Sequence, residues 1–365
     1  MMNVGMVGVG NISGIYLKNF RDTFKNVRLV AVCDLIRERA EKAQKEYDIP
    51  KIYDTMDELF ADPEINIVLN LTRPYQHYEV LKAALLVGKH VYSEKPLGAD
   101  FEEGTELVRL AKEKGLWIGG APDTFMGAGI QTCRKLIDSG AIGDLIGGRC
   151  VMASRGVETW HTDPDFYYQR GGGPVLDMGP YYITALVNLL GGVKKVYATA
   201  RTTFSERLIT AKPHMGEIIK VTVPTHYETL MTFENNVTVS FLTTFDVYKI
   251  PSNCILLYGT KGNLTVPDPN YFGSRNGMIL YDGETGEERE LPLEFNYSEN
   301  SRCLGLSELA AAIEQGRTPR ASYLQTYHVL EVMTGILTSA ETGEPYIMTT
   351  EFERLAPMDP NGDLR

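Results

Sequence analysis

A short apolar strand that runs into a glycine turn and then into a helix is the feature that most constrains the fold. Val4–Val7 is the apolar run of a buried strand, and the turn reads Gly8-Val9-Gly10-Asn11-Ile12-Ser13. Such glycines let backbone N–H groups approach a pyrophosphate, and the N-terminus of the following helix adds the positive end of its dipole. We therefore predict a dinucleotide site whose cofactor-binding residues include Gly8, Gly10, Asn11 and Ile12.

An acidic residue at the end of the next strand supports this interpretation. Val27–Cys33 is apolar and is followed by Asp34, about where a carboxylate accepts hydrogen bonds from an adenosine ribose. Ser13 takes the position of a third glycine, and its small side chain still permits close packing of helix against strand. Chance motifs of this kind occur in ordinary β–α turns, but the flanking strands and Asp34 favour a cofactor site.

Asp34 also indicates which dinucleotide binds. Its negative charge disfavours a 2′-phosphate, so we predict NAD, with NADP the lesser alternative. Arg37, on the helix that follows, either stacks on adenine, binds a phosphate, or is a solvated helix residue.

Composition narrows the class of protein. The 365 residues favour two domains, and 43% hydrophobic with 23% charged residues is typical of a globular protein. A net charge of −11 argues against a surface that neutralises nucleic-acid phosphates. The odd number of cysteines, without a C-x-x-C pair, indicates reduced thiols, and no apolar run has membrane-spanning length. We expect a cytoplasmic enzyme with a small-molecule partner, no nucleic acid and no membrane.

The first third of the chain alternates short β-rich runs with amphipathic segments. This alternation is typical of βαβ units and predicts a Rossmann domain, a doubly wound parallel sheet, over residues 1–121. The predicted strands are Val4–Val7, Val27–Cys33, Ile65–Leu71, His90–Ser93 and Leu116–Gly119. The predicted helices are Ile12–Phe24, Arg37–Tyr47, Tyr75–Val87 and Phe101–Lys114.

From about Asp144 the chain becomes strand-rich, with polar alternation and hairpin-like turns. We predict a second α+β domain over residues 122–365 that contains a large, mostly antiparallel open sheet. The closing helices, Leu304–Gln315 and Ser322–Ser339, are expected to cover one face of this sheet. The other face then needs a partner, so we expect a homodimer or homotetramer formed through this sheet.

A lysine follows the predicted fourth strand, in the sequence Glu94-Lys95-Pro96. Thr72, Pro74 and His77 follow the third strand, so both loops lie at the carboxyl edge of the sheet, where doubly wound folds bind ligands. The alternative is that Glu94 and Lys95 lie in a solvated loop and have no role in catalysis. Burial and neighbouring cations can lower the pKa of an ammonium beside a nicotinamide, which makes Lys95 a candidate for proton transfer.

A second cluster lies far along the chain. It begins with the aromatic stretch Trp160–Tyr168, continues through three glycines at 171–173, and ends with Asp177 and Tyr181. Asp177 and Tyr181 share a face if the helix begins near Val175; the alternative is that Asp177 caps the helix. The glycines permit close backbone approach to a ligand, and aromatic rings beside hydroxyl groups suit a carbohydrate or polyol. The histidine spacings do not indicate a metal site.

Together, the glycine turn, Glu94-Lys95-Pro96 and the glycine, Asp177 and Tyr181 segment resemble the Gfo/Idh/MocA oxidoreductases, the glucose–fructose oxidoreductase and inositol dehydrogenase family. The resemblance covers essentially the whole chain. It implies NAD(P)-dependent hydride transfer at a secondary alcohol, with Lys95 as the essential lysine and Asp177 as its acidic partner. It also implies that His77 and Glu94 lie near the cofactor.

One position departs from the family pattern. The family often has a histidine four residues after the aspartate, as acid–base catalyst, whereas this chain has Tyr181. Tyrosine has a pKa near 10 and needs a nearby cation to ionise at neutral pH. Three assignments compete: Tyr181 assisted by Lys95, Lys95 alone, or His161 from the preceding loop. We favour the first.

The expected activity is oxidation of a secondary ring hydroxyl of a sugar, glycoside or cyclitol. One alternative is an enzyme that oxidises a glycoside transiently, eliminates the aglycone and so cleaves the glycosidic bond. A protein that senses a dinucleotide without turnover is the third possibility, and Lys95, Asp177 and Tyr181 argue against it.

Overall fold

The computed structural model describes residues 1–248, 250 and 254–364. The chain divides into two compact units. The first comprises Met1–Gly127, Glu299–Leu330 and Met358–Arg365, and the second comprises Ala128–Ser298 and Glu331–Pro357. The first unit thus extends beyond residue 121 and takes in a segment that we expected in the second domain.

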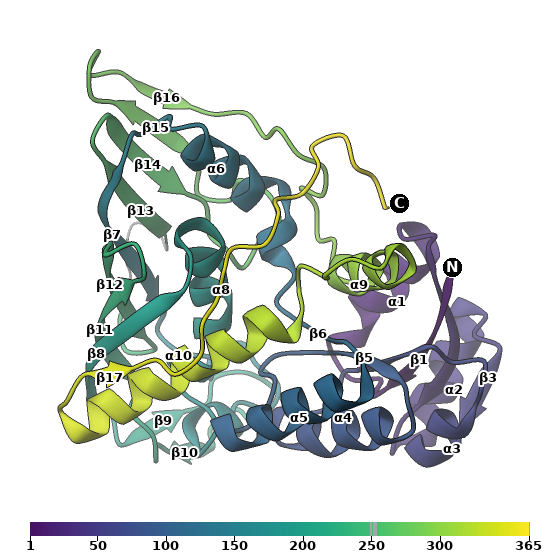
Figure 1. The fold of residues 1–365 in the computed structure, drawn as a ribbon. Helices are drawn as coiled ribbons and strands as arrows, with labels where there is room; N and C mark the ends of the chain where they lie inside the picture. The colour runs from purple at the N-terminus through teal and green to yellow at the C-terminus, as the bar shows by residue number, and fades with distance from the viewer. Residues whose placement is uncertain (249, 251–253, 365) are drawn as a thin grey trace. The chain divides into compact units, whose positions relative to one another are not determined.

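The first unit is built on a parallel sheet with helices between its strands (Figure 1). Its elements are β1 Met2–Val7, α1 Ser13–Asp22, β2 Val27–Cys33, α2 Arg37–Tyr47, β3 Lys51–Tyr53, α3 Met56–Ala61, β4 Ile67–Asn70, η1 Pro74–Gln76, α4 His77–Leu86, β5 His90–Ser93, α5 Phe101–Lys114, β6 Ile118–Gly120, η2 Thr124–Met126 and α9 Leu304–Gln315. Among the described residues the sheet has six strands in the order β3-β2-β1-β4-β5-β6, and every neighbouring pair is parallel. The order reverses after β1, which confirms the doubly wound Rossmann sheet.

The central strands are mostly apolar, as is typical of a parallel sheet whose two faces are covered by helices. All four residues of β4 are buried, as are the last four of β1 and β2. Two short elements, β3 and α3, were not predicted. A capping box begins α3, in which Thr55 accepts from the Glu58 backbone N–H and the Glu58 carboxylate accepts from the Thr55 backbone N–H. This T-x-x-E signal is readable in the sequence.

Helix α9 belongs to the first unit, so the expectation that it covers the second sheet is wrong. A backbone bridge joins Gly119, on β6, to Ser322. The Asp123 carboxylate accepts a hydrogen bond at 3.0 Å from the backbone N–H of Gly305, in the first turn of α9. These contacts hold α9 beside the end of the parallel sheet.

The second unit contains a mixed sheet of nine strands among the described residues, in the order β16-β15-β14-β13-β7-β12-β11-β8-β17. Its elements are α6 Ala128–Asp138, β7 Leu145–Ala153, η3 Asp165–Tyr168, α7 Pro174–Asp177, α8 Gly179–Leu190, β8 Val193–Arg201, β9 Glu206–Leu208, β10 Ile218–Lys220, β11 His226–Phe233, β12 Thr238–Thr244, β13 Cys254–Gly259, β14 Gly262–Val266, β15 Ile279–Asp282, β16 Glu288–Glu290 and β17 Tyr346–Ile347. Of the described neighbouring pairs, β7 and β12 alone run parallel, so the predicted mostly antiparallel sheet is confirmed.

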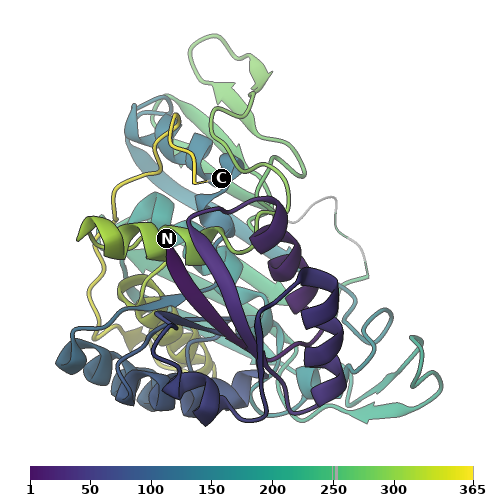
Figure 2. The same ribbon diagram turned by 90° about the vertical axis from the view of Figure 1, so that its right-hand side faces the viewer.

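Helices α6, α7 and α8 pack on this sheet and on one another. Helix α10 (Tyr323–Thr342) begins in the first unit and ends in the second. Strands β9 and β10 form a separate hairpin, which Figure 2 shows as a two-stranded ribbon beside the larger sheet. On the surface, side chains such as Tyr197 and Leu230, opposite each other on β8 and β11, are about half exposed.

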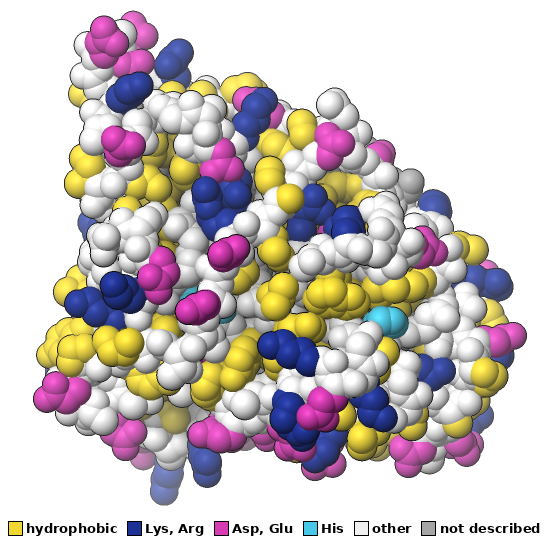
Figure 3. All heavy atoms as spheres, in the orientation of Figure 1, with side chains coloured by type: hydrophobic (Ala, Val, Ile, Leu, Met, Phe, Trp, Pro, Cys, Tyr) yellow, Lys and Arg dark blue, Asp and Glu magenta, His cyan; other side chains and the backbone are white. Residues whose placement is uncertain are grey.

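The surface charges, the cysteines and the helices can be compared with what the composition predicts. Acidic and basic side chains are interspersed on the face drawn in Figure 3. Cys33, Cys133, Cys150 and Cys303 are buried and form no disulfide, while the Cys254 side chain lies outside the described part. In the part of the chain that the structure describes, no helix has the length and apolar character needed to cross a membrane.

Candidate active site

The glycine turn after β1 has the geometry of a phosphate-binding turn. Gly8 has a φ of +95°, and a Cβ there would lie 2.9 Å from the Leu71 carbonyl group, so the position requires glycine. A Cβ on Gly10 would meet nothing within 4 Å, which leaves open space beside that backbone. Ser13 Oγ donates to the Gly10 carbonyl at 2.7 Å and stabilises the turn. The Ile12 side chain does not cap α1, so the first N–H groups of the helix suit an anion.

Asp34 is held in place at the end of β2. Its two carboxylate oxygens accept hydrogen bonds from the backbone N–H groups of Val9, at 2.6 Å, and of Ile36, at 2.7 Å. Each oxygen retains acceptor capacity for a ribose hydroxyl. The carboxylate therefore links the glycine turn to the predicted ribose position, and the residues present fit a dinucleotide.

Arg37 forms ion pairs with two nearby carboxylates. Its Nε donates to Glu41 at 2.9 Å, and its Nη1 pairs with Asp54. The side chain is about half exposed. This geometry favours the interpretation of Arg37 as a surface helix residue over a role in binding a 2′-phosphate.

Asn70, at the end of β4, organises the loops after β4 and β5. Its Oδ1 accepts from the Thr72 backbone N–H at 3.1 Å and from Thr72 Oγ1 at 2.7 Å, while its Nδ2 donates to Ser93 Oγ at 3.1 Å. Pro74 occupies the first turn of η1. Sequence reasoning did not single out Asn70. The available signal was a polar residue at the end of a fully buried strand.

His77 bridges the same two loops. It is completely buried, with Nδ1 2.7 Å from the Pro96 carbonyl and Nε2 3.1 Å from the Thr72 carbonyl. Burial lowers the pKa of this imidazole, and the two carbonyl oxygens act in the opposite direction because each accepts from a ring N–H. Both ring nitrogens face protein carbonyls. His77 therefore connects the loop that contains Thr72 to the Lys95-Pro96 loop.

Glu94 is oriented by two donors. Tyr16 Oη donates to Oε1 at 2.8 Å, and the Lys95 backbone N–H donates to Oε2 at 3.2 Å. Burial raises the pKa of the Tyr16 phenol, which keeps it protonated as a donor. Tyr16 was missed by sequence reasoning because helix periodicity marks it only as a core position.

Asp123, after β6, is another carboxyl of the first unit, and it is buried. Burial raises its pKa to about 6, the Glu94 charge acts in the same direction, and the Gly305 N–H and Arg302 oppose both. The carboxyl links the end of the parallel sheet to α9.

In the second unit, Gly172 and Gly173 pack closely against neighbouring backbone. The N–H of Gly172 donates to the Gln169 carbonyl at 2.8 Å, and that of Gly173 donates to the Tyr167 carbonyl at 2.7 Å. A Cβ on Gly172 would lie 2.3 Å from the Phe166 carbonyl oxygen. The close approach at Gly172 is thus to η3, and it ties the aromatic stretch to α7.

Asp177 and Tyr181 lie on either side of a helix break. Asp177 is the last residue of α7, Met178 is the N-cap of α8, and Pro180 falls in the first turn. Asp177 therefore does not occupy the N-cap position, and the capping alternative is wrong. Both Asp177 and Tyr181 are partly exposed to solvent.

His161 is packed among aromatic rings. Its ring centroid lies 5.0 Å from that of Tyr167 and 5.4 Å from that of Trp160, in edge-on geometry. Its Nδ1 accepts from the Asp163 backbone N–H at 3.0 Å. This bond assigns the proton of a neutral imidazole to Nε2, which makes Nε2 a donor rather than a base.

The candidate residues fall in both compact units. The turn at Gly8 and Gly10, Asp34, Glu94 and Lys95 belong to the first unit, and His161, Asp177 and Tyr181 belong to the second. Among the described residues, no group of three or more His, Cys, Asp or Glu side chains is arranged to hold a metal ion.

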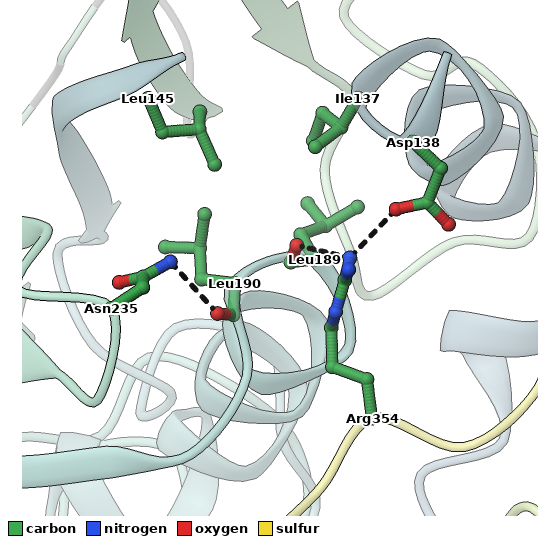
Figure 4. Close-up of a pocket in the computed structure, with 7 residues that line it drawn as sticks. All are labelled: Ile137, Asp138, Leu145, Leu189, Leu190, Asn235 and Arg354. Carbon is green, nitrogen blue, oxygen red and sulfur yellow. Dashed lines mark hydrogen bonds and ion pairs between the residues drawn. The ribbon is translucent and has the colours of Figure 1, made fainter. Parts of the chain in front are cut away.

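A pocket of about 390 Å³ lies elsewhere in the second unit (Figure 4). Arg354 closes one side, where its Nη1 donates to the Leu189 carbonyl at 3.0 Å and to Asp138 at 2.8 Å. Asn235 Nδ2 donates to the Leu190 carbonyl at 3.1 Å on the other side. These bonds satisfy the last carbonyls of α8, whereas Tyr181 lies near the start of that helix, about 14 Å away along its axis. The pocket is therefore separate from the candidate site.

Both the N-terminal and the central part of this chain are similar in sequence to known proteins. Residues 2–119 match the family model of oxidoreductases with an NAD-binding Rossmann fold, and residues 130–265 match the GFO/IDH/MocA C-terminal domain. Trans-1,2-dihydrobenzene-1,2-diol dehydrogenase of Bos taurus is 29% identical over 303 residues, covering 80% of this chain and 82% of the relative. D-xylose dehydrogenase of Paenarthrobacter nicotinovorans is 29% identical over 180 residues, covering 47% of this chain and 45% of the relative.

A solved structure has the same fold over nearly the whole chain. Levoglucosan dehydrogenase in complex with NADH and L-sorbose has a TM-score of 0.81 at 20% identity, covering 96% of this chain and 99% of that chain. The two family models match the parallel sheet of the first unit and most of the mixed sheet of the second. This chain belongs to the Gfo/Idh/MocA family of NAD-binding oxidoreductases.

Proposed function

We propose that this oxidoreductase transfers a hydride between NAD and a secondary ring hydroxyl of a sugar, glycoside or cyclitol. The observation that carries the proposal is the convergence of the Gly8 and Gly10 turn, Asp34 and the Glu94-Lys95 pair at the carboxyl edge of one parallel sheet. Relatives named as a cyclic diol dehydrogenase and a D-xylose dehydrogenase support a ring carrying neighbouring hydroxyls.

Cofactor binding is the task of the first unit. The open backbone at Gly10 and the uncapped start of α1 would hold the pyrophosphate, and Asp34 would accept the ribose hydroxyls. Bound NAD supplies the hydride acceptor. Repulsion between Asp34 and a 2′-phosphate, together with the ion pairs of Arg37, supports NAD over NADP.

Proton transfer is assigned to Tyr181 with help from Lys95, and Asp177 is the acidic partner of the lysine. Oxidation of an alcohol needs a group that accepts the hydroxyl proton, and a phenolate stabilised by an ammonium provides one. His161 is less suited as the base because its neutral form presents Nε2–H. Lys95 acting alone is the remaining alternative.

The same proposal includes a cytoplasmic location and a homodimer or homotetramer formed through the mixed sheet. Four buried cysteines that form no disulfide support a reducing compartment. Half-exposed apolar side chains on β8 and β11 support an interface on that sheet.

A substrate screen tests the function. Sugars, glycosides and inositols are incubated with the protein and NAD, absorbance is followed at 340 nm, and the products are analysed for released aglycone. NADH that accumulates with substrate supports a dehydrogenase. Release of aglycone without net NADH supports the glycoside-cleaving alternative, and neither outcome across the panel contradicts both.

A further inference from the structure

The aromatic segment, residues 159–167, is closed at its base by two buried side chains. Glu158 precedes it and Tyr168 follows it, and the Tyr168 hydroxyl donates to the Glu158 carboxylate. The Val157 backbone N–H donates to Tyr168 Oη at 3.2 Å. Burial raises the pKa of the Tyr168 phenol, so the hydroxyl stays a donor. The two ends of the segment are therefore held together by a buried hydrogen bond.

A buried arginine from another part of the chain, Arg207, forms hydrogen bonds to the base of this segment. Arg207, on β9, is only 2% exposed. Its Nη1 donates to the Arg155 carbonyl at 2.9 Å and to Glu158 Oε1 at 3.1 Å. Its Nη2 donates to the Phe245 carbonyl at 3.1 Å and to the Asp246 carboxylate. One planar guanidinium thus joins the start of the aromatic segment, the β9–β10 hairpin and the residues after β12.

The choice of arginine follows from the charges it meets. Glu158 and Asp246 are both buried, and a buried carboxylate needs a cation and several donors. A guanidinium serves two carboxylates and two carbonyls at once because its donors lie in a fixed plane. Its plane also faces the Phe204 ring, at 4.9 Å from guanidinium carbon to ring centroid.

The aromatic segment contains a solvent-exposed ring that is nevertheless held by contacts with neighbouring rings. Trp160 is 65% exposed, yet its ring packs edge-on against His161, which packs in turn against Tyr167. The loop of the β9–β10 hairpin supports the segment from below, where the N–H of Thr210 donates to the Glu158 carbonyl at 3.0 Å. An exposed indole held in a fixed orientation is a surface on which the C–H face of a sugar or polyol ring can stack.

We propose that Arg207 is a positioning residue for substrate binding: through Glu158 and Tyr168 it fixes the aromatic segment as a preformed stacking surface for a sugar or polyol ring. The inference rests on the proposed function for its substrate class. It assigns the β9–β10 hairpin to substrate selection, although the hairpin itself need not touch the substrate.

The most selective test is Tyr168→Phe, which keeps the buried ring and removes the hydroxyl that closes the segment. Thr225→Val is the matched control, because Thr225 Oγ1 donates at 2.8 Å to Asp246, on the other side of Arg207. Both variants remove a hydroxyl from the same buried cluster: Thr225→Val loses the bond to Asp246, and Tyr168→Phe loses the bond to Glu158 and the bond from the Val157 N–H. Only Tyr168→Phe loosens the base of the segment.

The readouts separate positioning from plain stability. Since the chain has 2 tryptophans, a Trp117→Phe background leaves Trp160 as the only fluorophore of its type, and its anisotropy reports order in the segment. Tyr168→Phe is expected to lower that anisotropy and to raise KM for the sugar or polyol about 3- to 10-fold, with kcat and the NAD dissociation constant unchanged. Thr225→Val is expected to leave all four quantities unchanged. Arg207→Lys, which keeps the charge but loses the fork, is expected to resemble Tyr168→Phe wherever it folds.

Unchanged anisotropy and KM in Tyr168→Phe would overturn the inference, as would an equal KM change in Thr225→Val. The anisotropy comparison needs no substrate, so it stands even if the screen finds no dehydrogenase activity. Failure of the proposed function is therefore distinguishable from failure of this inference.

Discussion

Single residues in this protein show their roles through the hydrogen bonds that orient them. Asp34 and His77 each contact backbone groups of two segments, and Glu94 accepts from the Tyr16 hydroxyl and the Lys95 backbone N–H, so each orients a loop at the edge of the parallel sheet. Sequence reasoning singled out Asp34 and Lys95 because each lies within two residues of the end of a recognisable strand. It did not single out Tyr16, Asn70 or Arg207, because each has a partner that is distant in sequence and meets it only in the folded chain.

Asp34→Ala is expected to weaken NAD binding about tenfold or more and to change NADP binding less, which narrows the preference for NAD. The variant loses the ribose acceptor and also the bonds to Val9 and Ile36. Isothermal titration with each dinucleotide measures the effect. Arg37→Ala is the control, expected to leave both affinities unchanged. Equal affinities of the unaltered protein for NAD and NADP would refute the assignment.

Tyr181→Phe is expected to lower kcat by roughly 10² to 10⁴ with little change in KM, because it removes the acid–base hydroxyl and keeps the ring. Tyr182→Phe is the matched control. The neighbouring Tyr182 is buried and its hydroxyl donates to Asp268 at 3.1 Å, so its loss should affect stability more than rate. Steady-state kinetics decide the matter. High activity in Tyr181→Phe together with inactive His161→Ala would transfer the role to His161.

At the scale of elements, the βαβ alternation of the first 120 residues was predictable from the sequence. The addition of α9 to the same unit was not. Strands β2 and β5 and helices α2 and α5 have the bounds expected from periodicity. Helix α9 has the periodicity of any amphipathic helix, and only its contacts with β6 and Asp123 reveal that it completes the first unit. Likewise, the spacing of Asp177 and Tyr181 suggested one helix, whereas Met178 interrupts it.

Asp123 gives the joint between β6 and α9 a pH dependence. Its pKa is about 6 in the folded protein and near 3.9 when unfolded, so between these values the folded state binds the extra proton. Stability from this group is therefore present below about pH 4 and declines as pH rises to about 6, by roughly 3 kcal/mol in all. Asp123→Asn removes the decline and retains an acceptor for Gly305. The difference in Tm between variant and parent should grow from about pH 4.5 to pH 7, and a constant difference would contradict the account.

At the scale of the whole molecule, we propose that the first compact unit binds the cofactor and the second binds the substrate. The parallel sheet carries the NAD-binding turn, and the mixed sheet carries the aromatic segment, Asp177 and Tyr181 on its connections. Alternation along β8 places Val196 and Ala198 in the core and Tyr197 on the opposite face. That face is where we expect a second copy to bind.

Leu230→Glu is expected to shift the protein toward monomer, because it places a charge beside Tyr197 on the exposed face of β8 and β11. Sedimentation velocity measures the change. Leu86→Glu is the control, since Leu86 on α4 is similarly exposed, at 52% against 51% for Leu230. An oligomer that survives Leu230→Glu, or one that dissociates equally in the control, would place the interface elsewhere.

Isotope transfer from substrate to cofactor tests the proposed hydride transfer itself. A substrate from the screen, deuterated at the ring carbon that bears the reacting hydroxyl, is incubated with the protein and NAD, and the cofactor is analysed by mass spectrometry. Deuterium is expected in the NADH and a carbonyl at that carbon, and Lys95→Met is expected to abolish the transfer while NAD binding persists. NADH without deuterium, or turnover that persists in Lys95→Met, would contradict this proposal.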